Sequence, residues 1–278
     1  MERGFFIMQP FKFFIAFMLF LFILPILISQ ISSDHSQESS SKEPITKPVA
    51  FANELTQLNT ISLSSKTPRI LYYFSHPEEA YKPILAEKLG VATNSASHKE
   101  TNITSLTPAF TQYFTFNQIQ ADSLQVNVAG ELQKLGLNYS ASYATTRPHI
   151  QERLKNQTYD LIIDFHRDSA KKSVTSVSNE NISYARIAFV IGTKNKNYEQ
   201  NLVYAQALHE QLNAMVPNIS RGIMKKGEPG SNGIYNQDLA PNMILIELGG
   251  VENTEEELTR TISILSTAIA KMFSSEQL

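Results

Sequence analysis

From residue 67 onward, short apolar runs alternate with longer amphipathic segments. Compact apolar runs are typical of buried strands, and apolar residues that recur every three or four positions are typical of helices. Strands are therefore predicted at 69–74, near 137–142, and at 159–165, 185–193 and 241–250. Helices are predicted at 77–90, 121–136, near 147–156, and at 198–216 and 253–273. This alternation predicts an α/β fold, an open and mostly parallel sheet with helices on both faces.

Several local features refine this pattern. Pro83 interrupts the first predicted helix, and Gly90 suits its end. The segment 121–136 places Leu124, Val128, Leu132 and Leu135 on one helical stripe. In the last helix, Thr254 and Glu257 have the spacing of a capping box. Residues 91–118 are polar and irregular, which predicts a long loop.

The first 66 residues follow a different pattern. Residues 11–29, "FKFFIAFMLFLFILPILIS", carry only the charge of Lys12, and about 20 apolar residues suffice to cross a bilayer. Arg3 and Lys12 predict that the amino end stays in the cytosol. The predicted organisation is a cytoplasmic segment 1–10, a transmembrane anchor 11–29, a polar linker 30–66 and a catalytic domain 67–278. The alternative is a cleaved signal peptide, for which "ISQISSDHS" offers a weak cleavage site.

Composition excludes several classes of protein. The chain has 278 residues and a formal net charge of -2, so it lacks the basic bias of a nucleic-acid-binding protein. It contains no cysteine, which excludes a thiolate nucleophile, a cysteine zinc site and disulfide bonds. A metal site must therefore draw on carboxylates and on the 6 histidines.

Three predicted strands deliver chemistry to one edge of the sheet. His76 follows the strand 69–74, His166 follows 159–165, and Glu247 lies in 241–250. Sites in open parallel sheets form beyond the carboxyl ends of the strands, so these side chains are expected to converge. Two imidazoles and a carboxylate suit zinc, whose catalytic sites usually have three protein ligands.

The residues alone leave alternatives for the third metal ligand and for the carboxylate that orients an imidazole. Glu78 or Glu79 could supply the third ligand, which leaves Glu247 as the general base. Asp164 or Asp168 could orient an imidazole. Each of these residues taken singly also fits an ordinary polar position at a strand end or in a first helical turn. Glu247 fits such a role least, because a carboxylate within an apolar strand is costly unless it is paired or functional.

Five stretches carry a resemblance to a known family. They are "YYFSHPEEAY" (72–81), "IDFHRDS" (163–169), "ARIAFVIGTKN" (185–195), "NISRGI" (218–223) and "YNQDLAPNMILIELGGVENTEEE" (235–257). Together they resemble stage II sporulation protein P, a family of membrane-anchored cell-wall hydrolases of endospore-forming bacteria, over residues 68–275. The last stretch is also similar to the closing P-x-x-L-x-E-x-G-F-x-x-N pattern of zinc N-acetylmuramoyl-L-alanine amidases.

The resemblance implies an amidase-like α/β fold and zinc-dependent cleavage of the amide between N-acetylmuramic acid and the L-alanine of the stem peptide. The family is also credited with endopeptidase action on peptide cross-links. His76, Glu79 and His166 match its metal ligands, Glu247 its catalytic glutamate, and Arg221 the arginine of its S-R-G motif.

The resemblance also implies a place in the cell. The expected location is the cell membrane, crossed once, with the catalytic domain outside the cytoplasm between mother-cell and forespore membranes. Expected partners are the peptidoglycan substrate, the membrane, and other engulfment proteins such as the stage II sporulation D and M proteins, but no nucleic acid.

Two competing functions remain at this stage. One is a non-catalytic peptidoglycan-binding or scaffold protein, against which Glu247 argues because a binder needs no general base. The other is a zinc peptidase that acts only on stem peptides. The sequence does not choose between amidase and endopeptidase, nor between Glu79, Glu78 and His98 as the third ligand.

Overall fold

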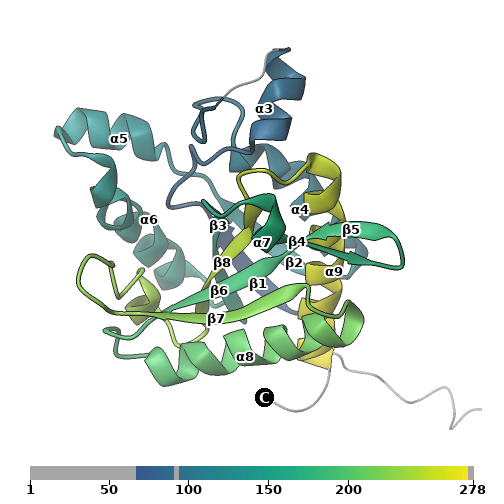
Figure 1. Cartoon of the computed structure of the whole chain (residues 1–278). Helices are drawn as coiled ribbons and strands as arrows, with labels where there is room; N and C mark the ends of the chain where they lie inside the picture. Colours follow the sequence, from purple (N-terminus) through teal and green to yellow (C-terminus); the bar gives the residue numbers. More distant parts are fainter. Residues whose placement is uncertain (1–66, 91–93, 275–278) are drawn as a thin grey trace, which may run out of the picture. The chain divides into compact units, whose positions relative to one another are not determined.

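Six strands form the central sheet of the computed structural model, which describes residues 67–90 and 94–274 (Figure 1). The strand order is β2-β1-β3-β8-β6-β7. The strands are β1 (Arg69–Tyr73), β2 (Gln120–Leu124), β3 (Leu161–Asp168), β6 (Ile187–Gly192), β7 (Ser220–Lys226) and β8 (Met243–Gly250). All neighbouring strands run parallel except β6 and β8, which are antiparallel. The predicted α/β fold with a mostly parallel sheet is confirmed.

Helices cover both faces of this sheet. One face packs against α4 (Thr107–Phe116), α8 (Tyr198–Met215) and α9 (Glu255–Ser274), which form the larger core with strand residues such as Tyr72, Phe165 and Ile246. The other face packs against α6 (Ser142–Asn156), whose Ile150 joins a smaller core. The helix α5 (Val128–Leu135) lies beside α6 (Figure 1).

The remaining elements are short. They are α3 (Lys82–Leu89), α7 (Lys172–Thr175), the hairpin β4 (Ser176–Asn179) and β5 (Ile182–Ala185), and the 3-10 turns η1 (Ile103–Leu106), η2 (Tyr139–Ala141) and η3 (Gln237–Leu239). The hairpin forms a separate two-stranded sheet.

The final helix α9 forms as its sequence predicts. The backbone amide of Thr254 donates to Glu257 Oε2 at 3.0 Å, and the Glu257 amide donates to Thr254 Oγ1 at 3.3 Å, so the capping box is present. Its apolar stripe is buried and consists of Leu258, Ile262, Leu265, Ile269 and Met272. Burial of this stripe against the sheet, rather than intrinsic propensity, holds the helix in place.

Two predictions in the first half of the domain were wrong. The supposed loop 91–118 contains η1 and α4, whose Phe110 and Phe114 are fully buried. Aromatic residues and threonine have modest helix propensity, so the tertiary packing of these rings decides the structure. The segment 121–136 begins as the edge strand β2, and Leu135 is 62% exposed. An edge strand as polar as "QADSL" leaves no apolar run to detect.

The segment after β1 also departs from prediction. The helix α3 begins only at Lys82, with Pro83 in its first turn rather than interrupting it, and Gly90 ends it at φ 70°. Glu79 therefore lies in a loop, where its backbone bridges to Ser97. Residues 137–142 form no strand, because η2 leads directly into α6. The strand β7 and the hairpin β4–β5 were not predicted.

The predicted anchor 11–29 and linker 30–66 lie outside the described residues. Within 67–90 and 94–274, no helix has the length and apolar character needed to span a bilayer.

Candidate metal centre and active site

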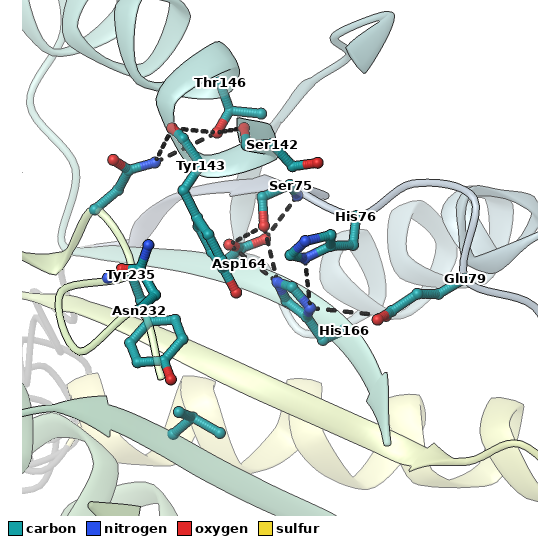
Figure 2. Close-up of polar contacts among 12 residues, drawn as sticks. Ser75, His76, Glu79, Ser142, Tyr143, Thr146, Asp164, His166, Asn232 and Tyr235 are labelled. Carbon is teal, nitrogen blue, oxygen red and sulfur yellow. Dashed lines mark hydrogen bonds and ion pairs between the residues drawn. The ribbon is translucent and has the colours of Figure 1, made fainter. Parts of the chain in front are cut away.

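Three side chains that were predicted to converge lie together at the carboxyl edge of β1 and β3. One ligand atom each of His76, Glu79 and His166 falls within 4.8 Å of the other two. The Nδ1 atoms of His76 and His166 are 3.3 Å apart, and His166 Nδ1 is 3.7 Å from Glu79 Oε2. Figure 2 shows the two rings and the carboxylate pointing toward one another. The three atoms form an open cluster of two nitrogens and one oxygen.

The orientation of His166 is set by Asp164 on its own strand and by Ser75, two residues after β1. His166 Nε2 lies 2.9 Å from Ser75 Oγ and 3.2 Å from Asp164 Oδ2. Asp164 in turn accepts hydrogen bonds from the Ser75 amide at 2.9 Å and the Ser75 hydroxyl at 2.7 Å. A proton on Nε2 is thereby held by Asp164, and Nδ1 faces the cluster. This is the arrangement by which a carboxylate orients a metal-binding histidine.

Glu79 is held in its loop by backbone bonds. The Arg167 amide donates to Glu79 Oε2 at 2.7 Å, and the Ile103 amide donates to the Glu79 carbonyl at 2.7 Å. The other two candidates for the third ligand lie outside the cluster. The imidazole of His98 accepts from the Thr101 amide at 2.9 Å, and Glu78 contributes its carbonyl to the His98 amide. Geometry thus brings Glu79, not Glu78 or His98, to the two histidines.

The cluster has the electrostatics of a cation site. Burial and the neighbouring His166 lower the pKa of His76 to about 4, which keeps that imidazole neutral and able to donate a lone pair. Burial opposes the charged form of His166, but Asp164 and Glu79 outweigh it and raise its pKa. Burial also opposes ionisation of Glu79, yet His166 and Arg167 hold its pKa below the usual value. The carboxylates that favour a positive charge on His166 also favour a metal cation at this place, and zinc takes imidazole nitrogen and carboxylate oxygen, so these residues fit that metal.

Glu247 lies one strand away from the cluster. It pairs with His166 across the parallel strands β3 and β8, so both side chains project from the same sheet face. Its Oε2 atom is buried and has no hydrogen-bond partner within the described part of the chain. Burial raises the pKa of Glu247 to about 7, with Glu79 and Asp168 adding to the effect against His166 and Arg167. An unpaired carboxylate with this pKa is suited to accept and return a proton near neutral pH.

Arg221 reaches the same region from the start of β7. Its guanidinium pairs with Asp168 at the end of β3, and both side chains are largely buried. Asp168 is thus engaged by Arg221 rather than by an imidazole, and Asp164 is the carboxylate that orients His166. Arg221 is thereby linked to the end of β3 through Asp168, two residues after His166.

Sequence reasoning missed the aromatic residues around the cluster. The ring of His76 lies 4.8 Å from that of Tyr139 and 4.9 Å from that of Tyr143, and Tyr143 meets Tyr235 edge to face at 5.4 Å. Tyr143 and Tyr235 also line a cavity of about 250 Å³ that reaches Glu247. Tyr139 and Tyr143 lie in segments with no distinctive pattern, and nothing in the stretch that begins at Tyr235 indicates a contact with them, so only the folded chain brings the three together.

Comparison with known proteins identifies the family. The family model described as stage II sporulation protein P matches residues 28–270. The chain belongs to the stage II sporulation protein P family. The resemblance found in the sequence is thereby confirmed. Stage II sporulation protein P of Bacillus subtilis (strain 168) is 38% identical over 205 residues, which are 73% of this chain and 51% of that protein. The chain therefore spans about half the length of this curated relative of the family.

Solved structures similar to this family member include amidases. The CwlD amidase of Clostridioides difficile, solved in complex with the GerS lipoprotein, has a TM-score of 0.48 and 13% identity, covering 75% of this chain and 100% of its own. The N-acetylmuramyl-L-alanine amidase Ami1 of Mycobacterium smegmatis has a TM-score of 0.44 and 12% identity, covering 75% and 98%. Because these scores and identities are low, the assignment of site residues rests on the geometry described above.

Proposed function

We propose that this chain is a zinc-dependent peptidoglycan hydrolase that cleaves the amide between N-acetylmuramic acid and the L-alanine of the stem peptide. The observation that carries the proposal is the convergence of His76, Glu79 and His166 beside the unpaired carboxylate of Glu247. Membership of the stage II sporulation protein P family supports a role in the cell wall of a sporulating cell.

The residues divide into two groups by role. His76, Glu79 and His166 would hold zinc, while Asp164 and Ser75 fix the ring of His166. When bound, zinc supplies a Lewis acid that activates water and polarises the scissile carbonyl. Glu247 is not needed as a ligand, because the other three side chains already provide the three protein ligands that are usual for a catalytic zinc site.

Glu247 moves the protons of the reaction. Its Oε2 accepts a proton from the attacking water as the water oxygen bonds to the carbonyl carbon. The same carboxyl group then gives the proton to the amide nitrogen as the carbon–nitrogen bond breaks. The products are a carboxylic acid on the sugar and a free amine on L-alanine. A pKa of about 7 allows Glu247 to act in both directions at neutral pH.

The proposed location follows from the first part of the sequence. The apolar segment 11–29 anchors the chain in the cell membrane, and the catalytic domain lies outside the cytoplasm, where peptidoglycan is found. The engulfment proteins named above are its proposed partners. A reporter that functions only in the cytosol, fused after Leu278, should be inactive, and an active fusion would contradict this topology.

The activity is tested on isolated peptidoglycan with detergent-solubilised full chain. Chelation should abolish hydrolysis, and added zinc should restore it. Mass spectrometry should find free stem peptides with an amino-terminal L-alanine and glycan strands without peptide. Full activity of metal-free protein would contradict the zinc site, and cut cross-links on peptides still joined to glycan would identify an endopeptidase. Binding without any cleavage would favour the scaffold alternative.

A further inference from the structure

A small pocket opens on the sheet face beside Glu247. Its volume is about 250 Å³. Leu245, Val190 and Met224 contribute apolar side chains, and Lys226 contributes a cation. Tyr143 and Tyr235 line it from α6 and from the loop before η3. None of these six residues has a role in the mechanism described above.

Strand register orders the pocket relative to Glu247. Leu245 pairs with Val190, and Val190 pairs with Met224, so the three apolar side chains form one row across β8, β6 and β7. Glu247 lies two residues beyond Leu245 on β8, at the next position on the same face, and pairs with Ala188. Lys226 pairs with Gly192, four residues beyond Ala188 on β6. At about 3.3 Å per residue, the cation is displaced by about 13 Å along the sheet from the register of Glu247.

The tyrosine wall of the pocket is held rigidly. Tyr235 and the next residue, Asn236, both adopt left-handed backbone conformations, with φ of 53° and 58°. The buried side-chain amide of Asn236 donates to the Tyr143 carbonyl at 2.9 Å and approaches Thr146 Oγ1 at 3.3 Å. The Tyr235 amide donates to Asn232 Oδ1 at 2.7 Å (Figure 2). Consecutive left-handed non-glycine residues persist only where surrounding contacts enforce them, and they are frequent at ligand sites.

A second cavity borders the loop that carries His76 and Glu79. It has a volume of about 850 Å³, begins at Pro77 and Glu78 next to His76, and is lined by amide side chains such as those of Asn102, Gln125 and Asn127. Its lining mixes amide side chains with aliphatic ones such as Val126 and Val128, and its volume suits a larger group than the small pocket does. The smaller pocket is below the usual range of roughly 300–1,000 Å³ for whole ligands, so it fits a short part of a longer substrate.

We propose that the pocket between Glu247 and Lys226 binds the stem-peptide side of the substrate. The apolar row receives the small side chain that follows the scissile amide, Tyr143 and Tyr235 enclose the peptide backbone, and Lys226 pairs with a peptide carboxylate. This inference rests on the proposed function, and it assigns substrate specificity to Met224, Tyr235 and Lys226.

Lys226 is available for such a pairing. Its ammonium group lies 3.2 Å from Glu228 Oε1, and the two side chains are 39% and 53% exposed. An exposed ion pair of this kind contributes about 0–1 kcal/mol. A substrate carboxylate held in the pocket can therefore replace Glu228 at little cost. Of the two carboxylates that line the pocket, Asp168 is paired with Arg221, and Glu247 lies on the far side of the apolar row from Lys226.

Binding to the full chain carrying Glu247→Gln, measured by calorimetry, tests the pocket without turnover. The probes are the free tetrapeptide L-alanyl-γ-D-glutamyl-L-lysyl-D-alanine and N-acetylmuramic acid without peptide. In the Glu247→Gln chain, the further substitution Met224→Trp fills the pocket and should weaken tetrapeptide binding at least tenfold. The substitution Lys226→Gln in the same chain should weaken tetrapeptide binding several-fold and reduce the dependence of that binding on salt. Binding of N-acetylmuramic acid should not change. Val203→Trp, at a position 52% exposed on α8, is the matched control and should change neither.

The outcomes separate the pocket from the proposed function. If the wild-type chain hydrolyses peptidoglycan but Met224→Trp and Lys226→Gln leave both tetrapeptide affinity and turnover unchanged, the pocket assignment is overturned and the hydrolase stands. If the tetrapeptide does not bind while the wild type hydrolyses, the assignment also fails. If the wild type does not hydrolyse but these variants lose tetrapeptide binding, the pocket stands and the hydrolase fails. Lys226→Gln alters only a partly exposed side chain, so it tests the proposal even if Met224→Trp does not fold.

Discussion

His166 and Glu247 occupy paired positions on the adjacent parallel strands β3 and β8, and their side chains leave the sheet on the same face. His166 points its Nδ1 atom at His76 and Glu79, whereas Glu247 Oε2 has no partner among the described residues. Metal binding and proton transfer are thus assigned to neighbouring strands. Each function can therefore be removed separately, and the predictions below use this separation.

Glu247→Gln should abolish turnover and leave the metal in place. Glutamine keeps the shape of the side chain but cannot accept the proton, so hydrolysis should fall by about 10²–10⁴-fold. Zinc content, measured by atomic absorption on the same preparation, should stay at the wild-type value because His76, Glu79 and His166 remain. Loss of zinc from this variant would instead make Glu247 a ligand.

The raised pKa of Glu247 predicts how the stability of the metal-free protein depends on pH. Because the folded state raises this pKa from 4.5 to about 7, folding favours the protonated carboxyl. The free energy of unfolding should therefore decrease as pH rises from 4.5 to 7, and the cost is fully present above pH 7. Under chelation, Glu247→Gln should be more stable than wild type at pH 8 by about 1–3 kcal/mol, and the difference should shrink at pH 5.

The measurement is urea unfolding at the two pH values, with Glu87→Gln on the exposed face of α3 as the control. A stabilisation of Glu247→Gln that is the same at pH 5 and pH 8 would show that ionisation of Glu247 is not its cause.

Asp164→Asn should weaken zinc binding. Asp164 holds the proton on His166 Nε2, and asparagine can donate to that nitrogen and so move the proton to Nδ1, the atom that faces the cluster. Loss of such an orienting partner typically lowers metal affinity by about 10–100-fold. Competition with a chromophoric chelator measures the affinity. The control is Asp122→Asn, which alters a carboxylate on β2 that accepts a hydrogen bond from Tyr159. An equal loss of zinc affinity in this control would exclude a specific role for Asp164.

Arg221 and Asp168 should show strong energetic coupling. Both side chains are largely buried, so removal of one leaves the other as a poorly solvated charge. Arg221→Met and Asp168→Asn should each lower the free energy of unfolding by about 2–4 kcal/mol. The double variant should lose clearly less than the sum of the two. Denaturant unfolding of the four proteins measures this, and strictly additive losses would show that the ion pair contributes nothing.

The ionised carboxylate of Glu257 should stabilise the folded domain at pH values above those at which it titrates. Burial opposes its charge, but bonds from Ser183, Lys172 and the Thr254 amide outweigh this effect and lower its pKa to about 2. The stabilisation is therefore present above pH 4.5 and is lost as pH falls from 4.5 to 2. Glu257→Gln should lower stability at pH 7 by about 1–3 kcal/mol. Thermal melts at pH 7 and pH 3 should show the difference narrowing in acid, and a constant difference would point to shape rather than charge.

The sequence predicted the parts of the fold that are apolar and regular. Strands β1, β3, β6 and β8 are fully or almost fully buried, so each leaves a continuous apolar run that cannot be mistaken for surface. The strand β2 and the helix α4 escaped prediction for opposite reasons. The first is a polar edge strand, and the second is stabilised by Phe110 and Phe114 in the core rather than by helix-forming residues.

The site was predictable only where the chain itself delivers residues to a strand end. His76 and His166 follow this rule, and Glu247 follows it from β8. The rule does not locate Arg221, which lies at the start of β7, because β6 and β7 run opposite to β8 and present their amino ends to the same edge. Tyr143 and Tyr235 come together through the bonds of Asn236, which no local pattern in the sequence announces.

The central position of β8 determines the order in which the catalytic centre can form. This strand is the last in the sequence, yet it lies between β3 and β6 and joins the two halves of the sheet. Until residues 243–250 have been synthesised, the first three strands and the β6–β7 pair have no common partner, and the general base is absent. A growing chain that has not yet reached β8 therefore carries His76 and His166 without Glu247. Under the proposed function, hydrolysis must await the complete domain, because the last strand supplies a residue that the reaction needs.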